Sequence, residues 1–271
     1  MTEIGCFLDT TVLAEALLKS ADRRKRAREA IREYKRSLLP GYAIKEFKAG
    51  PLRYFIWLHN KLVDTRSFSQ TIRAIHNAFR APYLKGTAEE ALEAAAEMLI
   101  GSNFSEADTR QKTQAAIADS LRLYIRRRID IAWRERRRLS TEVFDELSCY
   151  PETAHSYNEW TGYIDNDRSN CDLSDECCLA PGFRQRRGDL HKLITAIKGL
   201  TRNEDKKRRS ALHVLLERPP KTFGNQVCRE LGDAYFALQC PKDCEILTSN
   251  AKDHQILAGP LGKKVRKYEI N

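Results

Sequence analysis

Near its start the sequence reads Ile4-Gly-Cys-Phe-Leu-Asp9-Thr-Thr-Val-Leu13, and this stretch decides the expected fold class. The apolar residues before Asp9 are typical of a short strand that is buried on both faces, as in the middle of a parallel sheet. An apolar helix is predicted directly after it, from Val12 to Leu18. Asp9 therefore ends a central strand at the carboxyl edge of the sheet, where open α/β sheets bind ligands. The simpler interpretation is that Asp9 or Thr10 only caps the helix.

The residues up to about position 50 complete a strand–helix–strand–helix unit. A very basic helix is expected from Asp22, and Ser37-Leu-Leu39 is predicted to be a short strand. A further helix, from Tyr42 to about Lys48, carries Glu46 in its second turn. This alternation of strands and helices predicts a parallel sheet with helices packed on it.

The last fifty residues return to the same pattern. We expect a helix over 226–238 that contains Asp233, a strand over 244–248, a polar turn over 249–253 and an edge strand over 265–270. Residues 1–50 and 225–271 are therefore predicted to form one α/β domain, although almost two hundred residues separate its two parts.

Residues 51–224 are predicted to be a mostly helical insertion into that domain. The expected helices cover 51–63, 66–80, 87–100, 106–138, 189–200 and 204–217. The segment 149–188 is polar and contains cysteines and scattered aromatic residues without clear periodicity, so it is expected to be rich in loops. An insertion of this length is far larger than an ordinary connection between two elements.

The composition favours a protein that binds a polyanion in the cytoplasm. The 47 Lys and Arg residues exceed the 37 Asp and Glu residues, which leaves a net charge of +10. A basic balance of this size is typical of proteins that contact nucleic acid. No apolar run approaches the roughly 18 residues of a membrane span, and no secretory signal is evident, so no membrane contact is expected. The eight cysteines are expected to be reduced thiols.

Four acidic motifs occur in order on the two parts of the predicted α/β domain. They are Phe7-Leu-Asp9-Thr-Thr-Val-Leu13, Pro40-Gly-Tyr-Ala-Ile-Lys-Glu46-Phe47, Gly232-Asp233-Ala-Tyr-Phe-Ala-Leu238 and Ile246-Leu-Thr-Ser-Asn250-Ala-Lys-Asp253-His254. Together they resemble the motifs of the PIN-domain family of metal-dependent ribonucleases, which includes the toxins of many toxin–antitoxin pairs. The resemblance implies a PIN-like three-layer domain with a short parallel sheet.

The resemblance also implies a metal-dependent catalytic site. Asp9, Glu46, Asp233 and Asp253 are the expected catalytic residues, and Asp9, Glu46, Asp233 and Asn250 are the expected ligands of Mg²⁺ or Mn²⁺. Carboxylate oxygens suit these hard cations, which activate water and neutralise charge on a phosphate during displacement. Asn250 stands where the family has its fourth acid, so a second metal is expected to bind weakly or not at all.

Two functions from different classes remain open at this point. The first is a divalent-metal-dependent endonuclease that hydrolyses phosphodiester bonds, as a toxin or a defence effector. RNA is the favoured substrate, and DNA is left open. The second is a catalytically silent PIN-like module that binds nucleic acid, or a protein partner or inhibitor, through the helical insertion. The intact trio of acids favours the enzyme, whereas Asn250 favours the silent module.

Several basic and hydroxyl residues are candidates for contact with a nucleic acid. They are Arg126, Arg127, Arg128, Lys252, Thr10 and Thr248. Arginine runs on helices can follow a phosphate backbone. They can equally be solvated faces with acidic partners one turn away, and the threonines can be caps.

Two further patterns are weighed against the carboxylate site. Cys149, Cys171, Cys177 and Cys178 with His155 or His191 could bind zinc, but they contain no Cys-x-x-Cys pair, so a structural zinc is not expected. Arg208 and His213 fit the Arg-x4-His pattern of the HEPN family of helical ribonucleases, which would make a metal-independent alternative site.

Overall fold

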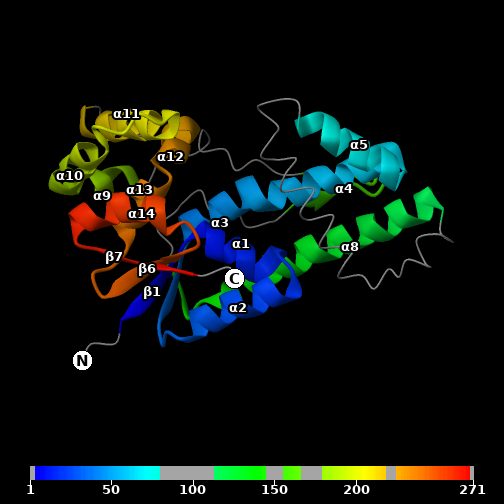
Figure 1. Cartoon of the computed structure of the whole chain (residues 1–271), viewed down its shortest axis with the longest axis horizontal. Helices are drawn as coiled ribbons and strands as arrows, with labels where there is room; N and C mark the ends of the chain where they lie inside the picture. The colour runs from blue at the N-terminus through cyan, green and yellow to red at the C-terminus, as the bar shows by residue number, and fades with distance from the viewer. Residues whose placement is uncertain (1–3, 80–112, 145–154, 166–178, 218–223, 269–271) are drawn as a thin grey trace.

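A computed structural model describes residues 4–79, 113–144, 155–165, 179–217 and 224–268, and it contains a five-stranded sheet in which all paired strands are parallel (Figure 1). Four of the strands were predicted: β1 (Gly5–Leu8), β2 (Ser37–Pro40), β6 (Cys244–Thr248) and β7 (Lys264–Lys267). The prediction of an α/β fold with a short parallel sheet built from both ends of the chain is therefore confirmed.

The strand order is β3-β2-β1-β6-β7, so β1 is the central strand. Phe7 of β1 is paired with Leu38 of β2 on one side and with Ile246 of β6 on the other. The chain leaves β1 toward β2 and later returns to the other side of β1 as β6. The carboxyl ends of β1 and β6 therefore flank the point where the winding direction reverses, which is the usual place for a ligand in such a sheet.

The edge strand β3 (Glu142–Phe144) was not predicted, and it lies within the expected helical insertion. It pairs with β2 through Leu39 and Val143. Three residues that follow an arginine-rich stretch show no alternation or apolar run from which a strand could be recognised. The insertion therefore supplies one edge of the sheet as well as helices.

Helices pack around the sheet and on one another. The elements that follow β1 and β2 are α1 (Thr10–Leu18), α2 (Ala21–Arg32), α3 (Gly41–Phe47) and the π-helix Lys48–Leu52. The C-terminal part adds α12 (Gly224–Leu231), α13 (Asp233–Gln239), α14 (Ala251–Ala258) and the 3-10 turn Gly259–Leu261. Phe7 contacts Phe144 and Phe236 edge-on, so the core of the sheet joins residues from three distant parts of the chain.

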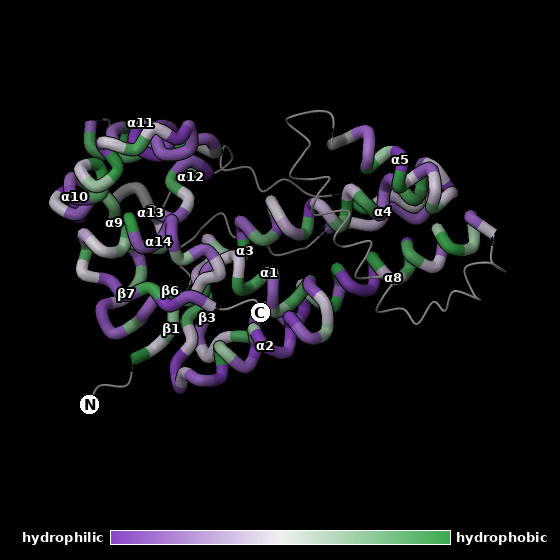
Figure 2. The backbone as a smooth tube through the Cα atoms, in the orientation of Figure 1, coloured by the Kyte–Doolittle hydropathy of each residue, from purple (hydrophilic) through white to green (hydrophobic). Residues whose placement is uncertain are grey.

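The helices of the predicted insertion lie in two groups (Figure 1). The first contains α4 (Arg53–Thr65), α5 (Phe68–Phe79) and α8 (Gln114–Glu135), which ends in the 3-10 turn Arg136–Leu139. In this group α4 and α8 run side by side away from the sheet, and α8 alternates between hydrophobic and hydrophilic colouring (Figure 2). The second contains α9 (Leu179–Gln185), α10 (Arg187–Ile197) and α11 (Asn203–Glu217), near α12 and α14.

Smaller differences from the prediction have local causes. The helix expected over 226–238 is divided into α12 and α13 at Gly232, whose φ of 46° is incompatible with a continuous helix. A short hairpin, β4 (Ser156–Tyr157) with β5 (Ile164–Asp165), lies in the segment predicted to be loop-rich. The helix predicted over 87–100 falls outside the described residues. No described helix has both the length and the apolar character that a membrane span requires.

Candidate active site at the carboxyl edge of the sheet

Asp9 lies directly after β1 and is the residue around which the candidate site is built. Its carboxylate caps α1 by accepting a hydrogen bond from the Thr10 backbone N–H at 2.7 Å. Its other oxygen accepts hydrogen bonds from the hydroxyls of Thr11 and Thr248, at 2.6 and 2.7 Å. Only 3% of Asp9 is exposed. The capping role weighed from the sequence is therefore present, and it coexists with a network that extends to β6.

Thr10 and Thr248, the threonines predicted to contact nucleic acid, bond to the acids and position them. The Thr10 hydroxyl donates to Glu46 Oε2 at 2.7 Å, which ties α3 to the start of α1. Thr248 is fully buried at the end of β6 and donates to Asp9. Thr11 accepts a hydrogen bond from the Ser249 backbone N–H at 3.1 Å, which holds the end of β6 against the start of α1.

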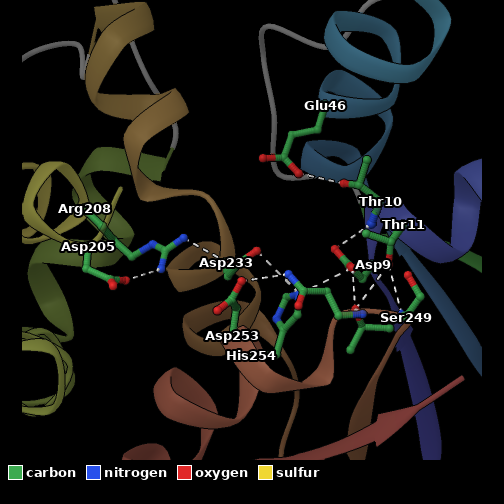
Figure 3. A network of polar contacts seen from close by, with 12 residues as sticks. Asp9, Thr10, Thr11, Glu46, Asp205, Arg208, Asp233, Ser249, Asp253 and His254 are labelled. Carbon is green, nitrogen blue, oxygen red and sulfur yellow. Dashed lines mark hydrogen bonds and ion pairs between the residues drawn. The ribbon is translucent and has the colours of Figure 1, made fainter. Parts of the chain in front are cut away.

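Asp233, the first residue of α13, completes the group of acids. Figure 3 shows Asp9, Glu46 and Asp233 extending from three different elements toward the same region. The side chain of Asp233 is 24% exposed, and that of Glu46 is also partly exposed, so the site is open on one side. The structure therefore brings together the three acids that the sequence motifs singled out.

A buried histidine that sequence analysis did not assign lies between two of these acids. His254 Nε2 is 3.4 Å from Asp9 Oδ2 and 3.5 Å from Asp233 Oδ1, and neither approach has the geometry of a hydrogen bond. The ring is fully buried in α14 and packs edge-on against Phe236. Its position one residue after Asp253, in the first turn of a helix at the sheet edge, was the available sign in the sequence.

Arg208 of α11 provides a second cation. Its Nη2 donates to Asp233 Oδ2 at 2.9 Å, and its Nη1 donates to the buried Asp205 at 3.4 Å. Arg208 therefore belongs to the carboxylate network. His213 is the other half of the Arg-x4-His pattern. It is exposed, and its Nδ1 lies 3.8 Å from Glu217, one turn further along α11.

The charges of this network shift the titration of its members in different directions. Burial raises the pKa of Glu46 to about 7, and the charges of Asp9 and Asp233 add to this effect. Burial also raises the pKa of Asp233, although His254 and Arg208 oppose it. Burial alone would raise the pKa of Asp9, but His254, Thr11 and Thr248 outweigh it and hold that pKa below its usual value.

The pKa of His254 is raised, as expected for a histidine between two acids. Burial disfavours its charged form, but Asp9, Asp233 and Glu46 outweigh burial and raise its pKa. A charged imidazolium and an ionised Asp9 stabilise each other in this buried position. The three acids therefore favour a positive charge on His254 at the place where they meet.

The remaining predicted site residues lie at the margin of the network. Asp253 accepts hydrogen bonds from Arg202 at 2.7 Å and from the Asn250 side chain at 2.9 Å. Asp253 and Asn250 therefore bond to each other, and Asp253 also bonds to Arg202. Arg202 and Asn250 hold the pKa of Asp253 below its usual value against the effect of burial. Lys252 is exposed on α14.

The arginine run of α8 is at the opposite end of α1 from Asp9. Arg128 donates to the backbone carbonyl of Leu17, in the last turn of α1, whereas Asp9 caps the first turn. The guanidinium of Arg126 lies 3.6 Å from the ring centroid of Tyr157. Arg127 is exposed. Arg128 thus joins the insertion to α1, and Arg126 packs within the insertion.

The donor set suits a hard divalent cation, although the described residues contain no group of three or more His, Cys, Asp or Glu side chains arranged as a finished metal site. Three carboxylates converge, and hard oxygen ligands are what Mg²⁺ and Mn²⁺ prefer. His254 lies close to both Asp9 and Asp233, and Arg208 bonds to Asp233, so a cation at this place would compete with both of them. The predicted zinc-candidate cysteines lie outside the described residues, and the four described cysteines are free thiols.

Comparison with known proteins adds no assignment to this geometry. The chain matches no family model, no curated protein and no solved structure. The site is therefore interpreted from its own chemistry.

Proposed function

We propose that the protein is a divalent-metal-dependent endonuclease that hydrolyses phosphodiester bonds in RNA, with a PIN-like domain split by the helical insertion. The observation that carries this proposal is the convergence of Asp9, Glu46 and Asp233 at the carboxyl ends of β1 and β6. These acids come from segments far apart in the chain, yet one hydrogen-bonded and charged network joins them. Groups of acids at this edge of a parallel sheet are suited to ligand chemistry.

Asp9, Glu46 and Asp233 would hold the cation, with Asn250 at the margin of the group. Bound there, a divalent metal would supply an activated water and neutralise charge that develops on the phosphate. Thr11 and Thr248 fix the orientation of Asp9, and Thr10 fixes that of Glu46. These hydroxyls hold the acids in place before a ligand arrives, which reduces the reorganisation that binding requires.

The arrangement of cations also supports the second candidate, a silent module that binds without cleaving. His254 and Arg208 already neutralise Asp9 and Asp233, so a divalent ion has to compete with two groups of the protein itself. If this competition fails under all conditions, the acids serve only to position His254 and Arg208. The two candidates therefore differ in whether Mn²⁺ or Mg²⁺ binds.

The test combines metal binding with cleavage of labelled single-stranded and hairpin RNA. Wild-type protein is expected to bind Mn²⁺ by calorimetry and to cut RNA with Mn²⁺ or Mg²⁺ but not with EDTA. Asp9→Asn and Glu46→Gln are expected to lower the rate by about a hundredfold or more, since each removes a ligand charge. Asp243→Asn is the matched control, because Asp243 is an exposed acid that pairs with Arg36 before β6.

The outcomes separate the candidates. Cleavage that persists in EDTA and in Asp9→Asn would contradict the metal-dependent mechanism. Tight RNA binding with neither metal binding nor cleavage would favour the silent module instead.

A further inference from the structure

Helices α11 and α12 border an open pocket of about 1060 Å³ that lies next to the carboxylate network. Its lining includes Arg202, Lys207, Arg208 and Arg229, set against Glu204 and Glu230. Among the residues that the structure describes, the side chains lining it are charged or polar, and none is aromatic. A surface of this kind offers no stacking face for a base, but it offers several donors to an anion.

Two of the four cations are held in fixed positions by acids of the protein. Asp205, only 1% exposed, accepts hydrogen bonds from both Arg202 and Arg208. This buried carboxylate therefore holds two of the guanidinium groups that line the pocket in place. Arginine in a fixed orientation is suited to paired hydrogen bonds with phosphate oxygens.

The other two cations are available to a ligand. Lys207 and Arg229 are exposed, and neither forms an ion pair with any residue that the structure describes. They face the pocket from opposite helices, α11 and α12. A negatively charged group that entered between them would gain two partners without displacing an acid of the protein.

Arg208 links the pocket to the proposed catalytic acids. Arg208 lines the pocket and also donates to Asp233 at 2.9 Å, and Figure 3 shows it reaching toward Asp233 from α11. Gly232, the residue before Asp233, is part of the lining. A side chain there would approach Arg208, because an added Cβ would lie 3.4 Å from its Nη2. The glycine therefore leaves room for the Arg208 guanidinium where it meets Asp233.

We propose that this pocket binds the phosphodiester backbone of a nucleic-acid strand and leads that strand to Asp233. The inference rests on the proposed nuclease function and names the place where the substrate is held. It assigns the binding of phosphates to Lys207 and Arg229, on the second group of inserted helices and on α12, and not to the arginine run of α8.

The test measures binding of the full-length protein to a fluorescent single-stranded RNA in EDTA, so that it does not depend on cleavage. Lys207→Ala combined with Arg229→Ala is expected to weaken binding about tenfold at ~50 mM salt. The slope of log affinity against log salt should become shallower by about 0.7 for each phosphate that is no longer neutralised. Lys206→Ala is the matched control, because Lys206 is the exposed neighbour of Lys207 on α11 and does not line the pocket. It should change affinity less than twofold.

Further arms identify the ligand. A DNA strand of the same sequence tests which sugar is preferred, and binding of either strand that depends on Lys207 and Arg229 supports the proposal. Inorganic phosphate that competes as well as the strand, mole for mole, would overturn it in favour of a site for free phosphate. Equal losses of affinity in Lys206→Ala and Lys207→Ala, or no loss in the double variant, would also overturn it.

The result can be separated from the test of the nuclease itself. If the double variant of Lys207 and Arg229 binds RNA as tightly as wild type, and wild type cleaves RNA with metal, the proposal for the pocket is refuted and the proposed nuclease function stands. Binding that depends on both residues, without cleavage under any metal condition, would support the pocket and refute the nuclease.

Discussion

Asp9 combines three roles in one side chain, since it ends β1, caps α1 and accepts a hydrogen bond from Thr248 at the end of β6. A buried carboxylate with this many donors and a charged neighbour contributes to stability as long as it is ionised. The same residue is the first proposed metal ligand. Its substitution therefore tests both the network and the metal site.

We expect Asp9→Asn to destabilise the metal-free protein by about 2 kcal/mol, because His254 loses its nearer partner and remains buried. For a chain of this size such a destabilisation lowers Tm by about 5 °C. The measurement is thermal unfolding at pH 7 with EDTA, and Asp243→Asn is the control at an exposed ion pair. A higher Tm in Asp9→Asn would mean that repulsion among the acids outweighs their contacts with His254.

Glu46 predicts how stability depends on pH in the absence of metal. Its pKa of about 7 in the folded protein is above its ordinary value of 4.5, so the folded state holds a proton that the unfolded state releases. Between these two values the unfolding free energy should fall as pH rises. His254, whose folded pKa is also raised, loses its stabilising contribution in the same direction.

Thermal unfolding in EDTA across pH 4 to 8 measures this dependence. Glu46→Gln should reduce the loss of stability above about pH 5, since an amide does not titrate in this range. A loss of the same size in wild type and Glu46→Gln would assign the pH dependence to other groups.

At the scale of elements, the break between α12 and α13 determines where Asp233 points. Gly232 has φ 46° and ψ −125°, a conformation that residues with a side chain rarely adopt. This turn starts α13 at Asp233 and places Asp233 against Arg208 and His254.

Gly232→Ala should therefore destabilise the fold by about 1–3 kcal/mol and weaken Mn²⁺ binding, because relief of the strain would move Asp233. Gly188→Ala provides the contrast, since Gly188 lies within α10 at negative φ and nothing is within 4 Å of an added Cβ. That change should stabilise by about 0.4–1 kcal/mol. The two variants are compared by denaturant unfolding. Equal changes in the free energy of unfolding would show that the backbone conformation of Gly232 does not require a glycine.

At the scale of the whole molecule, the predicted insertion is part of the structure that supports the site. It supplies β3, which pairs with β2, and α8, whose Arg128 bonds to the end of α1. It also supplies Arg208, the partner of Asp233. The segment 51–224 thus contacts the predicted α/β part through β2, α1 and Asp233.

A protein in which a short linker replaces residues 51–224 is therefore expected not to fold. It would expose apolar surface of β2 and α1 and leave Asp233 without its arginine. Circular dichroism and dispersion of amide resonances are the measurements. A cooperative unfolding transition in the shortened chain would show that the α/β part is an independent domain.

The fold class and three of the proposed site residues could be predicted from the sequence alone. Its apolar runs at 4–8, 37–39 and 244–248 are short, separated by helical patterns and ended by polar residues, which is sufficient to predict a parallel sheet. Asp9 could be selected because it ends a predicted strand at the carboxyl edge of the sheet. Glu46 and Asp233 lie on predicted helices, and they were selected because their motifs, in this order, resemble those of the PIN-domain family.

The cationic groups beside these acids became evident only in the tertiary structure. His254 ends the fourth acidic motif but was assigned no role, and Arg208 was considered only as half of an Arg-x4-His pattern. Their place beside the acids depends on distances of 2.9 to 3.5 Å across the fold. The edge strand β3 was likewise set by pairing with β2, since three residues contain too little pattern of their own. The local periodicity of a sequence indicates which face of an element is buried. The charged partner of a buried acid depends instead on which distant elements pack against it, and local periodicity does not contain that information.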